Sequence, residues 1–215
     1  MKKIYEKLYS YYGPQKWWPI IQKKPTKQQK ISEIIIGTIL TQNTSWKNVE
    51  KALNNLNKNH LLSFKNIKKT KTEKLARLIK SSGYYNQKAD RLKLIADFYI
   101  NNDLTKLSTE QLRNKLLTLK GVGNETADSI LLYAFNRPIF VIDSYTKRIF
   151  SRMGFCNNNI TYEELQNLFM QNLKKDIILF KEYHALLVKL AKEFCKNKPL
   201  CKKCIFSKSC KKLFK

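Results

Sequence analysis

The ten residues 119–128, LKGVGNETAD, lie between two segments whose apolar residues follow helical spacing. On the N-terminal side, Ser108 and Gln111 form a capping box, and leucines recur on one helix face up to Leu119. On the C-terminal side, Asn124 is a good N-cap, and a second buried apolar stripe begins at Ala127. The stretch therefore predicts a helix, a tight Gly-Val-Gly hairpin and a second helix.

This hairpin has the properties of a phosphate-binding loop. Gly121 and Gly123 permit a tight turn and a close approach of the backbone to a ligand, and the second helix starts with unpaired N–H groups. Because the helix dipole also favours negative charge there, a DNA phosphate is the expected occupant. The alternative is that Gly-Val-Gly only connects two helices. If the hairpin binds DNA, the contacts come from Lys120, Gly121, Val122, Gly123, Asn124 and Thr126.

The charge balance points to a polyanionic partner. The 215 residues contain 42 Lys and Arg against 16 Asp and Glu, a formal charge of +26. Such an excess attracts nucleic acid, with binding that weakens as salt concentration rises. A coding bias toward Lys would not explain why Asp and Glu are so few. A membrane-surface protein is disfavoured, because no apolar run could span a bilayer and lysine is spread along the whole chain.

The N-terminus leads from MKKIY into aromatic residues and Gly13-Pro14, without the apolar stretch or cleavage site of a secretory signal. We therefore expect an intracellular protein of the cytoplasm or nucleoid. In a reducing compartment, the five cysteines are expected to be metal or cluster ligands rather than disulfides.

Four cysteines near the C-terminus have the spacing of a compact ligand loop. Cys195, Cys201, Cys204 and Cys210 follow the pattern C-x5-C-x2-C-x5-C, which suits a 4Fe-4S cluster held by four thiolates. Zinc sites usually contain two C-x2-C pairs and this loop has one, so zinc or a disulfide pair is the less favoured alternative. Seven lysines lie between residues 196 and 212, and their positive charge favours binding of this segment to the DNA backbone. Cys156 is interpreted as an ordinary buried thiol.

Helical patterns account for most of the remaining chain. Further helices are expected within residues 5–12, 31–40, 46–56, 75–79, 89–99 and 183–194, and a capping box of Thr161 and Glu164 opens another. The segment 139–142 is the most strand-like, but it is too short to build a sheet. The expected fold class is all-α.

The chain resembles the endonuclease III superfamily of helix-hairpin-helix DNA glycosylases. The hairpin, then Asp143 twenty residues after Gly123, then the cysteine loop occur in the order found in that superfamily, and the segment LTQN at 40–43 is similar to its polar helix end. The first cysteine gap has five residues where better-known members have six. The sequence ETAD at 125–128 resembles the 3-methyladenine DNA glycosylase III branch.

This resemblance implies two helical lobes that flank a DNA-binding groove. Residues 25–135 would form a helical barrel with the helix-hairpin-helix, and residues 1–24 plus 136–215 would form the lobe with the cluster loop 195–210. The implied protein is a monomeric base-excision-repair enzyme with a 4Fe-4S cluster that acts on double-stranded DNA containing damaged bases. A monovalent cation on the hairpin carbonyls is a further option.

Asp143 is the expected catalytic residue. Positive charge builds on the deoxyribose as a base leaves, and a nearby carboxylate stabilises that charge or activates water. A helix N-cap is the alternative role, and both can hold. Bifunctional relatives have a lysine just before the hairpin-helix threonine, whose amine attacks C1′. Glu125 occupies that place here, and Lys120 lies on the other side of the glycines, so a monofunctional glycosylase is implied.

Trp17, Trp18 and Trp46 fall in segments that the resemblance places beside the substrate pocket. An alkylated purine such as 3-methyladenine carries positive charge, and cation–π attraction would contribute about 0.5–2 kcal/mol per ring. Core packing is the alternative for Trp17 and Trp18. Gln42 is expected either to fill the gap left by a flipped base or to form a polar helix end.

For four further residues, a structural role is favoured over a functional one. Tyr84 and Tyr85 are expected to pack at the surface, with a wedge or pocket role as the alternative, and His60 and His184 are expected to be structural. Two other functions stay open. One is a glycosylase and AP lyase for oxidised pyrimidines that uses a different lysine; the other is a non-catalytic helix-hairpin-helix DNA-binding module.

Overall fold

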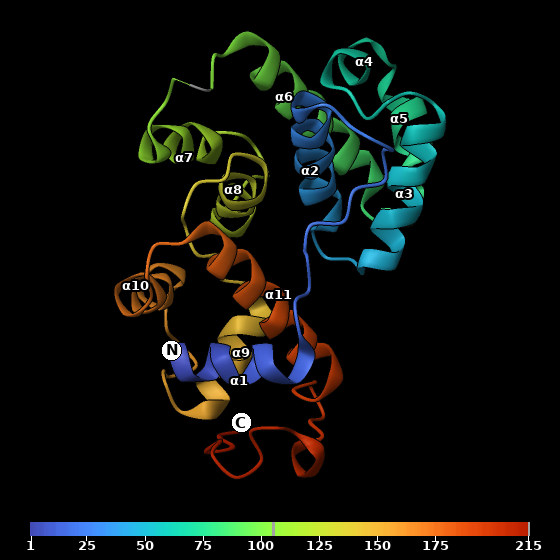
Figure 1. Ribbon diagram of the computed structural model, residues 1–215. Helices are drawn as coiled ribbons and strands as arrows, with labels where there is room; N and C mark the ends of the chain where they lie inside the picture. Colours follow the sequence, from blue (N-terminus) through green and yellow to red (C-terminus); the bar gives the residue numbers. More distant parts are fainter. Residues whose placement is uncertain (105, 215) are drawn as a thin grey trace. The chain divides into compact units, whose positions relative to one another are not determined.

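The chain folds into helices joined by loops (Figure 1). The computed structural model describes residues 1–104 and 106–214, and it contains no β-strand within these ranges. The α-helices are α1 (Lys2–Tyr12), α2 (Lys27–Thr41), α3 (Trp46–Lys58), α4 (Phe64–Lys69), α5 (Thr72–Leu78), α6 (Tyr85–Asn101), α7 (Thr109–Leu117), α8 (Asn124–Ser129), α9 (Ser144–Met153), α10 (Tyr162–Asn172) and α11 (Ile177–Glu193). Short 3-10 helices η1 (Lys80–Ser82) and η3 (Cys201–Lys203) and the π-helix η2 (Ile130–Ala134) complete them. The all-α prediction is confirmed.

Local capping decides several helix starts. The predicted capping boxes of Ser108 and Thr161 are both present, and they open α7 and α10. A third box, formed by Thr26 and Gln29, was not foreseen. It starts α2 at Lys27, earlier than the expected residue 31, because the threonine oxygen satisfies an otherwise unpaired N–H group of the first turn.

The second helix of the hairpin departs from the prediction at its first residue. Gly123, in extended conformation, is the N-cap of α8, and Asn124 is already helical. The prediction of Asn124 as N-cap was wrong, because its side-chain oxygen accepts a hydrogen bond from Arg113 Nη2 at 3.2 Å instead. The predicted apolar stripe is buried, but from Ile130 onward it continues as the π-helix η2.

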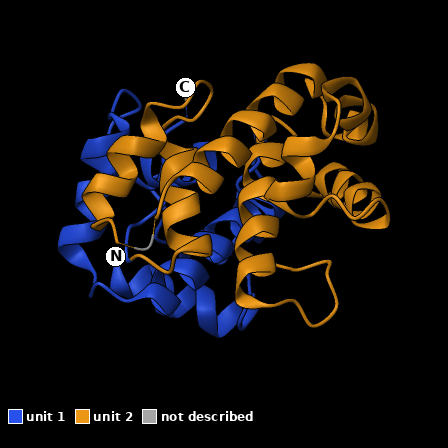
Figure 2. Ribbon diagram, turned by 90° about the horizontal axis from the view of Figure 1, so that it is seen from above, with its two compact units in different colours: residues 1–17, 138–215 blue, residues 18–137 orange. Residues whose placement is uncertain are grey.

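The chain divides into two compact units (Figure 2). Unit 1 consists of Met1–Trp17 and Pro138–Lys215, and unit 2 is Trp18–Arg137. Unit 2 contains the helix-hairpin-helix, and unit 1 contains Asp143 and the cysteine loop. The residue ranges expected for the two functional lobes remain a prediction.

Helix α2 is the centre of unit 2. Its residues from Ser32 to Leu40 are all buried, and it packs against α3, α6 and η2. Lys88 of α6 is 1% exposed and donates to the carbonyls of Leu40 and Ser82 at 2.8 and 2.7 Å. Burial lowers the pKa of this lysine to about 8. These hydrogen bonds tie the end of α2 to the turn before α6 and so fix the start of the 41–43 segment.

Unit 1 is built around α11, which packs against α1 and α9. Aromatic rings fill its core; Phe140 stacks on Phe169 with centroids 4.0 Å apart, and both rings contact Tyr183 of α11. The irregular segment before α9 is held by this core, since Phe140, Val141 and Ile142 are buried. The residue that follows them is Asp143, so the core determines where the N-terminus of α9 lies.

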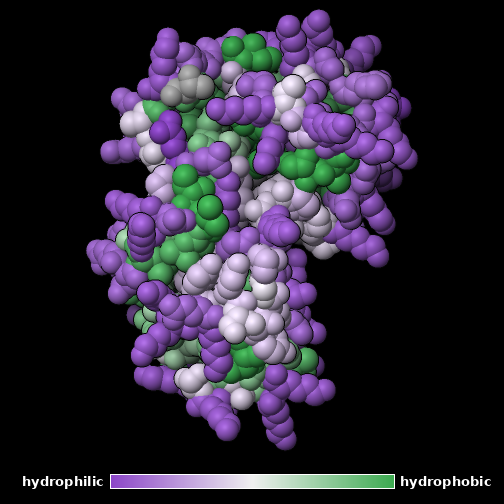
Figure 3. Space-filling model, in the orientation of Figure 1, coloured by the Kyte–Doolittle hydropathy of each residue, from purple (hydrophilic) through white to green (hydrophobic). Residues whose placement is uncertain are grey.

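Hydrophilic side chains cover most of the surface visible in Figure 3, and the apolar patches between them are small and separate. This surface agrees with the high net charge of the chain. In the part of the chain that the structure describes, no helix is both long and apolar enough to cross a membrane.

Candidate functional site

Asp143 lies at the N-terminus of α9 and is its N-cap. Its Oδ1 atom accepts a hydrogen bond from the Thr146 amide at 2.7 Å. The side chain is nearly buried but keeps 11% of its surface exposed, so the carboxylate is not sealed in the interior. The cap role is therefore present, and it is compatible with a second role at the exposed edge.

His184 of α11 lies beside this carboxylate. Its Nε2 atom is 3.6 Å from Asp143 Oδ2, and the imidazole is 12% exposed. Burial alone would raise the pKa of Asp143, but His184 and hydrogen bonding from Thr146 outweigh it, and the pKa lies below its ordinary value. Asp143 is thus an ionised carboxylate at neutral pH. The expectation that His184 is only structural missed this contact, which depends on the packing of α9 against α11.

The two hairpin glycines have different conformations. Gly121 has φ of 85°, in the left-handed region that favours glycine, and an added Cβ would meet the side chain of Arg91. Gly123 has φ of −98° and open space where a Cβ would be. Lys120 and Gly123 are exposed and Val122 is buried. Gly123 is therefore free of the structural constraint that acts on Gly121.

Gln42 and Thr126 support the hairpin from within unit 2. Gln42 Nε2 donates to the Gly121 carbonyl and to the Thr126 hydroxyl, both at 2.9 Å, and Gln42 Oε1 accepts from Arg91. Thr126 is buried. The polar helix end expected of Gln42 is thus joined to the hairpin, and its side chain positions the loop.

A buried ion pair fixes α7 against α8. Arg113 Nε and Nη2 donate to the two carboxylate oxygens of Asp128 at 2.7 and 3.1 Å. Asp128 is fully buried, and the pairing is bidentate. The aspartate of the ETAD sequence is therefore a structural residue that sets the hairpin geometry. Glu125, in contrast, is exposed in the first turn of α8.

The structure brings two of the three tryptophans together. Trp18 packs edge-on against Trp46 with centroids 5.3 Å apart, and it also contacts Tyr133 at 5.4 Å. Gly37 allows this packing, because a Cβ there would be 2.9 Å from the Trp18 ring. Trp17 is the last residue of the N-terminal part of unit 1 and is partly exposed.

Two buried glutamates hold the backbone on either side of these tryptophans. Glu182 of α11 accepts from the amides of Gln15 and Lys16 at 2.6 and 2.8 Å. Glu33 of α2, fully buried, accepts from the amides of Ile21 and Gln22. Sequence reasoning missed both glutamates, since no local pattern shows that a helical Glu will bind a distant backbone.

The four C-terminal cysteines line one small cavity of about 30 Å³, together with Phe194 and Phe206. Backbone amides of Phe206 and Lys212 donate to the sulfurs of Cys204 and Cys210. Within residues 1–104 and 106–214, no three His, Cys, Asp or Glu side chains converge on a single metal ion. Four cysteine sulfurs that line one cavity, with N–H donors directed at three of them, match the thiolate donor set of a 4Fe-4S cluster. Cys156 is partly exposed and contacts Ser151.

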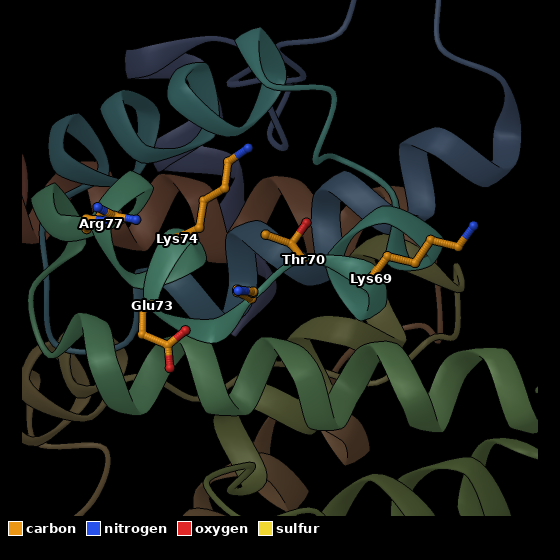
Figure 4. Close-up of a pocket in the computed structure, with 6 residues that line it drawn as sticks. Lys69, Thr70, Glu73, Lys74 and Arg77 are labelled. Atoms are coloured by element: carbon orange, nitrogen blue, oxygen red, sulfur yellow. The ribbon is translucent and has the colours of Figure 1, made fainter.

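The remaining residues considered from the sequence do not lie in a comparable cluster of side chains. Tyr84 is 65% exposed in left-handed conformation, Tyr85 is partly exposed, and His60 is exposed. A polar groove of about 500 Å³ lies at the junction of α4 and α5 (Figure 4). Several long cationic side chains line it, and the labelled ones point in different directions. Its lining residues are Lys69, Thr70, Lys71, Glu73, Lys74 and Arg77.

Comparison with known proteins identifies the family. Residues 36–175, more than half of the chain, match the HhH-GPD superfamily base excision DNA repair protein. A Methanocaldococcus jannaschii protein, provisionally named a DNA repair glycosylase, is 46% identical over 97% of this chain and 94% of its own. Endonuclease III of Sulfolobus acidocaldarius is 30% identical over 86% of this chain and 83% of its own.

Among solved structures, H. pylori 3-methyladenine DNA glycosylase bound to 1,N6-ethenoadenine superposes with a TM-score of 0.73 and 26% identity, over 89% of this chain and 96% of that one. The helix-hairpin-helix of residues 109–129 lies inside the matched family region, as does Asp143. The chain belongs to the HhH-GPD superfamily of base excision DNA repair proteins, and with it to the endonuclease III superfamily of DNA glycosylases.

Proposed function

We propose that this chain is a monofunctional DNA glycosylase that hydrolyses the N-glycosidic bond of alkylated purines, such as 3-methyladenine, in duplex DNA. The observation that carries the proposal is the ionised, nearly buried Asp143 at the start of α9. A fixed negative charge in a poorly solvated site stabilises positive charge far better than the same group in water. Positive charge is what develops on the deoxyribose as the base leaves.

The monofunctional part of the proposal rests on Glu125. A lyase step needs an amine that attacks C1′, and the place where the resemblance puts that amine holds a carboxylate exposed to solvent. Lys147, the lysine closest to Asp143 in sequence, donates to the Ile160 carbonyl at 2.6 Å. We therefore assign hydrolysis of the glycosidic bond, with water as the nucleophile, to this chain.

The substrate class is supported by the aromatic side chains of unit 2. Trp18 and Trp46 pack edge-on, an arrangement in which the face of one ring meets the edge of the other. An electron-rich aromatic surface attracts a cationic purine more than a neutral base. The likeness to H. pylori 3-methyladenine DNA glycosylase supports the same class. We propose Trp17, Trp18 and Trp46 as substrate-binding residues.

Binding to damaged double-stranded DNA is assigned to the hairpin and to the net charge of +26. Lys120 and the amides of residues 121–124 would contact phosphate, and hairpin carbonyls could hold a monovalent cation. Gln42, while bound to Gly121 and Thr126, would act by positioning the hairpin. We propose that the four cysteines of the 195–210 loop hold a 4Fe-4S cluster, whose role there is to stabilise the loop.

Base release from a panel of duplexes tests the proposal. The panel contains 3-methyladenine, 7-methylguanine, oxidised pyrimidines, uracil and mismatched thymine, and borohydride is added in parallel reactions. We expect release of the methylated purines, an intact abasic strand and no covalent protein–DNA adduct. Release of oxidised pyrimidines with a trapped adduct would establish the second candidate, a glycosylase and lyase, which the similarity to endonuclease III favours. If no base is released from any duplex, the remaining candidate is a non-catalytic DNA-binding module.

Replacing each hairpin glycine by alanine separates folding from DNA binding. Gly121→Ala should lower the stability by about 1–3 kcal/mol, because φ is positive and Arg91 occupies the space of the Cβ. Gly123→Ala should keep the melting temperature but weaken duplex binding roughly tenfold, since its Cβ would obstruct one phosphate hydrogen bond. Thermal melts and affinity for a duplex with an abasic-site analogue measure the two effects. Wild-type affinity of the Gly123→Ala variant would exclude phosphate binding at this edge of the hairpin.

A further inference from the structure

The carboxylate of Asp143 is held from two different helices. Its Oδ1 atom accepts from the Thr146 amide of α9 at 2.7 Å, and its Oδ2 atom faces Nε2 of His184 from α11 at 3.6 Å. The terminal torsion of an aspartate is soft, and rotation about it moves both carboxylate oxygens together. A contact on each oxygen, from separate elements, restricts that rotation.

The helix that carries His184 is firmly anchored on both sides of this residue. Tyr183 is fully buried and donates to the Met1 carbonyl at 3.1 Å, and Glu182 is bound by the amides of Gln15 and Lys16. Leu186 and Leu187 are also fully buried. The backbone of α11 therefore cannot shift freely, and the imidazole is delivered to the carboxylate from a fixed position.

The contact between His184 and Asp143 lies in a poorly solvated part of unit 1. Both side chains are only 11–12% exposed, and electrostatic interactions strengthen as water is removed. The nearest cationic residues of α9 have other partners; Lys147 binds the Ile160 carbonyl and Arg148 binds the Cys195 carbonyl. His184 is thus placed to influence the orientation of the carboxylate.

We propose that His184 is a positioning residue for Asp143, which holds the Oδ2 atom in a fixed orientation toward the deoxyribose from which the base departs. This inference rests on the proposed catalytic role of Asp143. His184 itself makes no contact with the reacting atoms in this proposal. Its effect on the rate of base release passes entirely through Asp143, so a substitution of His184 should have no effect once the Asp143 carboxylate is removed.

The test is a double-mutant cycle measured under single-turnover conditions with a 3-methyladenine duplex. His184→Phe keeps an aromatic ring but removes the N–H groups, and it should slow base release about tenfold. His184→Gln retains a donor and should stay within roughly threefold of the wild-type rate. Melting temperature and affinity for a duplex with an abasic-site analogue should not change. The chain's other histidine gives the matched control, since the exposed His60→Asn should behave as wild type.

The decisive comparison is His184→Phe in an Asp143→Asn background, where it should have no further effect on the rate. A wild-type rate for His184→Phe alone, or the same tenfold loss in both backgrounds, would overturn the positioning role while leaving the catalytic role of Asp143 intact. A wild-type rate for Asp143→Asn alone would instead overturn the proposed function, and the role of His184 with it. The two failures are therefore distinguishable.

Discussion

Asp143→Asn is expected to slow base release by about a thousandfold without unfolding the protein. The amide keeps an oxygen that can accept from the Thr146 amide, so the start of α9 is preserved. What the variant loses is the negative charge that would stabilise the developing sugar cation. Single-turnover release of 3-methyladenine measures the rate, and thermal melting measures the fold.

Unit 1 offers a matched control for this substitution. Asp176 is the N-cap of α11 and accepts from the Leu179 amide at 2.8 Å, the same kind of contact that Asp143 makes at α9. Asp176→Asn therefore removes an equivalent charge from an equivalent cap elsewhere in the unit, and its rate should equal that of the wild type. If both variants keep wild-type rates, Asp143 is a cap and no more.

Loss of one loop cysteine is expected to remove the cofactor and to release the C-terminal segment. Within the loop the buried apolar side chain is Phe206, so the structure of the loop would depend on the group that the sulfurs are proposed to hold. Protein purified without oxygen should contain roughly four iron atoms and an equal amount of acid-labile sulfide per chain. Cys204→Ser should contain far less of both, and limited proteolysis should cut within residues 195–214.

Cys156→Ser is the control for this experiment. Cys156 is the fifth cysteine and lies outside the loop, beside Ser151. Its replacement should leave iron content and proteolytic resistance unchanged. Zinc in place of iron in the wild-type protein, or iron retained by Cys204→Ser, would contradict the cluster assignment.

Features that depend on neighbouring residues could be predicted from the sequence. The capping boxes of Ser108 and Thr161, and the cap at Asp143, need only a side chain and an amide two or three positions away. The all-α fold follows in the same way from helical spacing of apolar residues. Asn124 shows where even this local reasoning fails. A distant partner, Arg113, takes the oxygen that would otherwise form the cap.

Features that depend on the packing of distant segments could not be predicted. Nothing local shows that His184 faces Asp143, that Lys88 binds the end of α2, or that Gln42 holds the hairpin carbonyl. Each of these side chains is polar and lies at or near a helix–helix contact, where its partner is set by tertiary structure. The resemblance to a family identified the motif residues, whereas the residues that position them came from the structure.

The hydrogen bonds that Glu33 and Glu182 accept from main-chain amides have an evolutionary consequence. Because both acids accept hydrogen bonds from main-chain amides, these four attachments, at residues 15, 16, 21 and 22, do not depend on which side chain each position has. Only proline at the four anchored positions would break the attachment, since it has no N–H to donate. Trp17 and Trp18 lie between these anchors, so on the proposed substrate-binding role a substitution there would alter lesion preference while the flanking backbone stays attached.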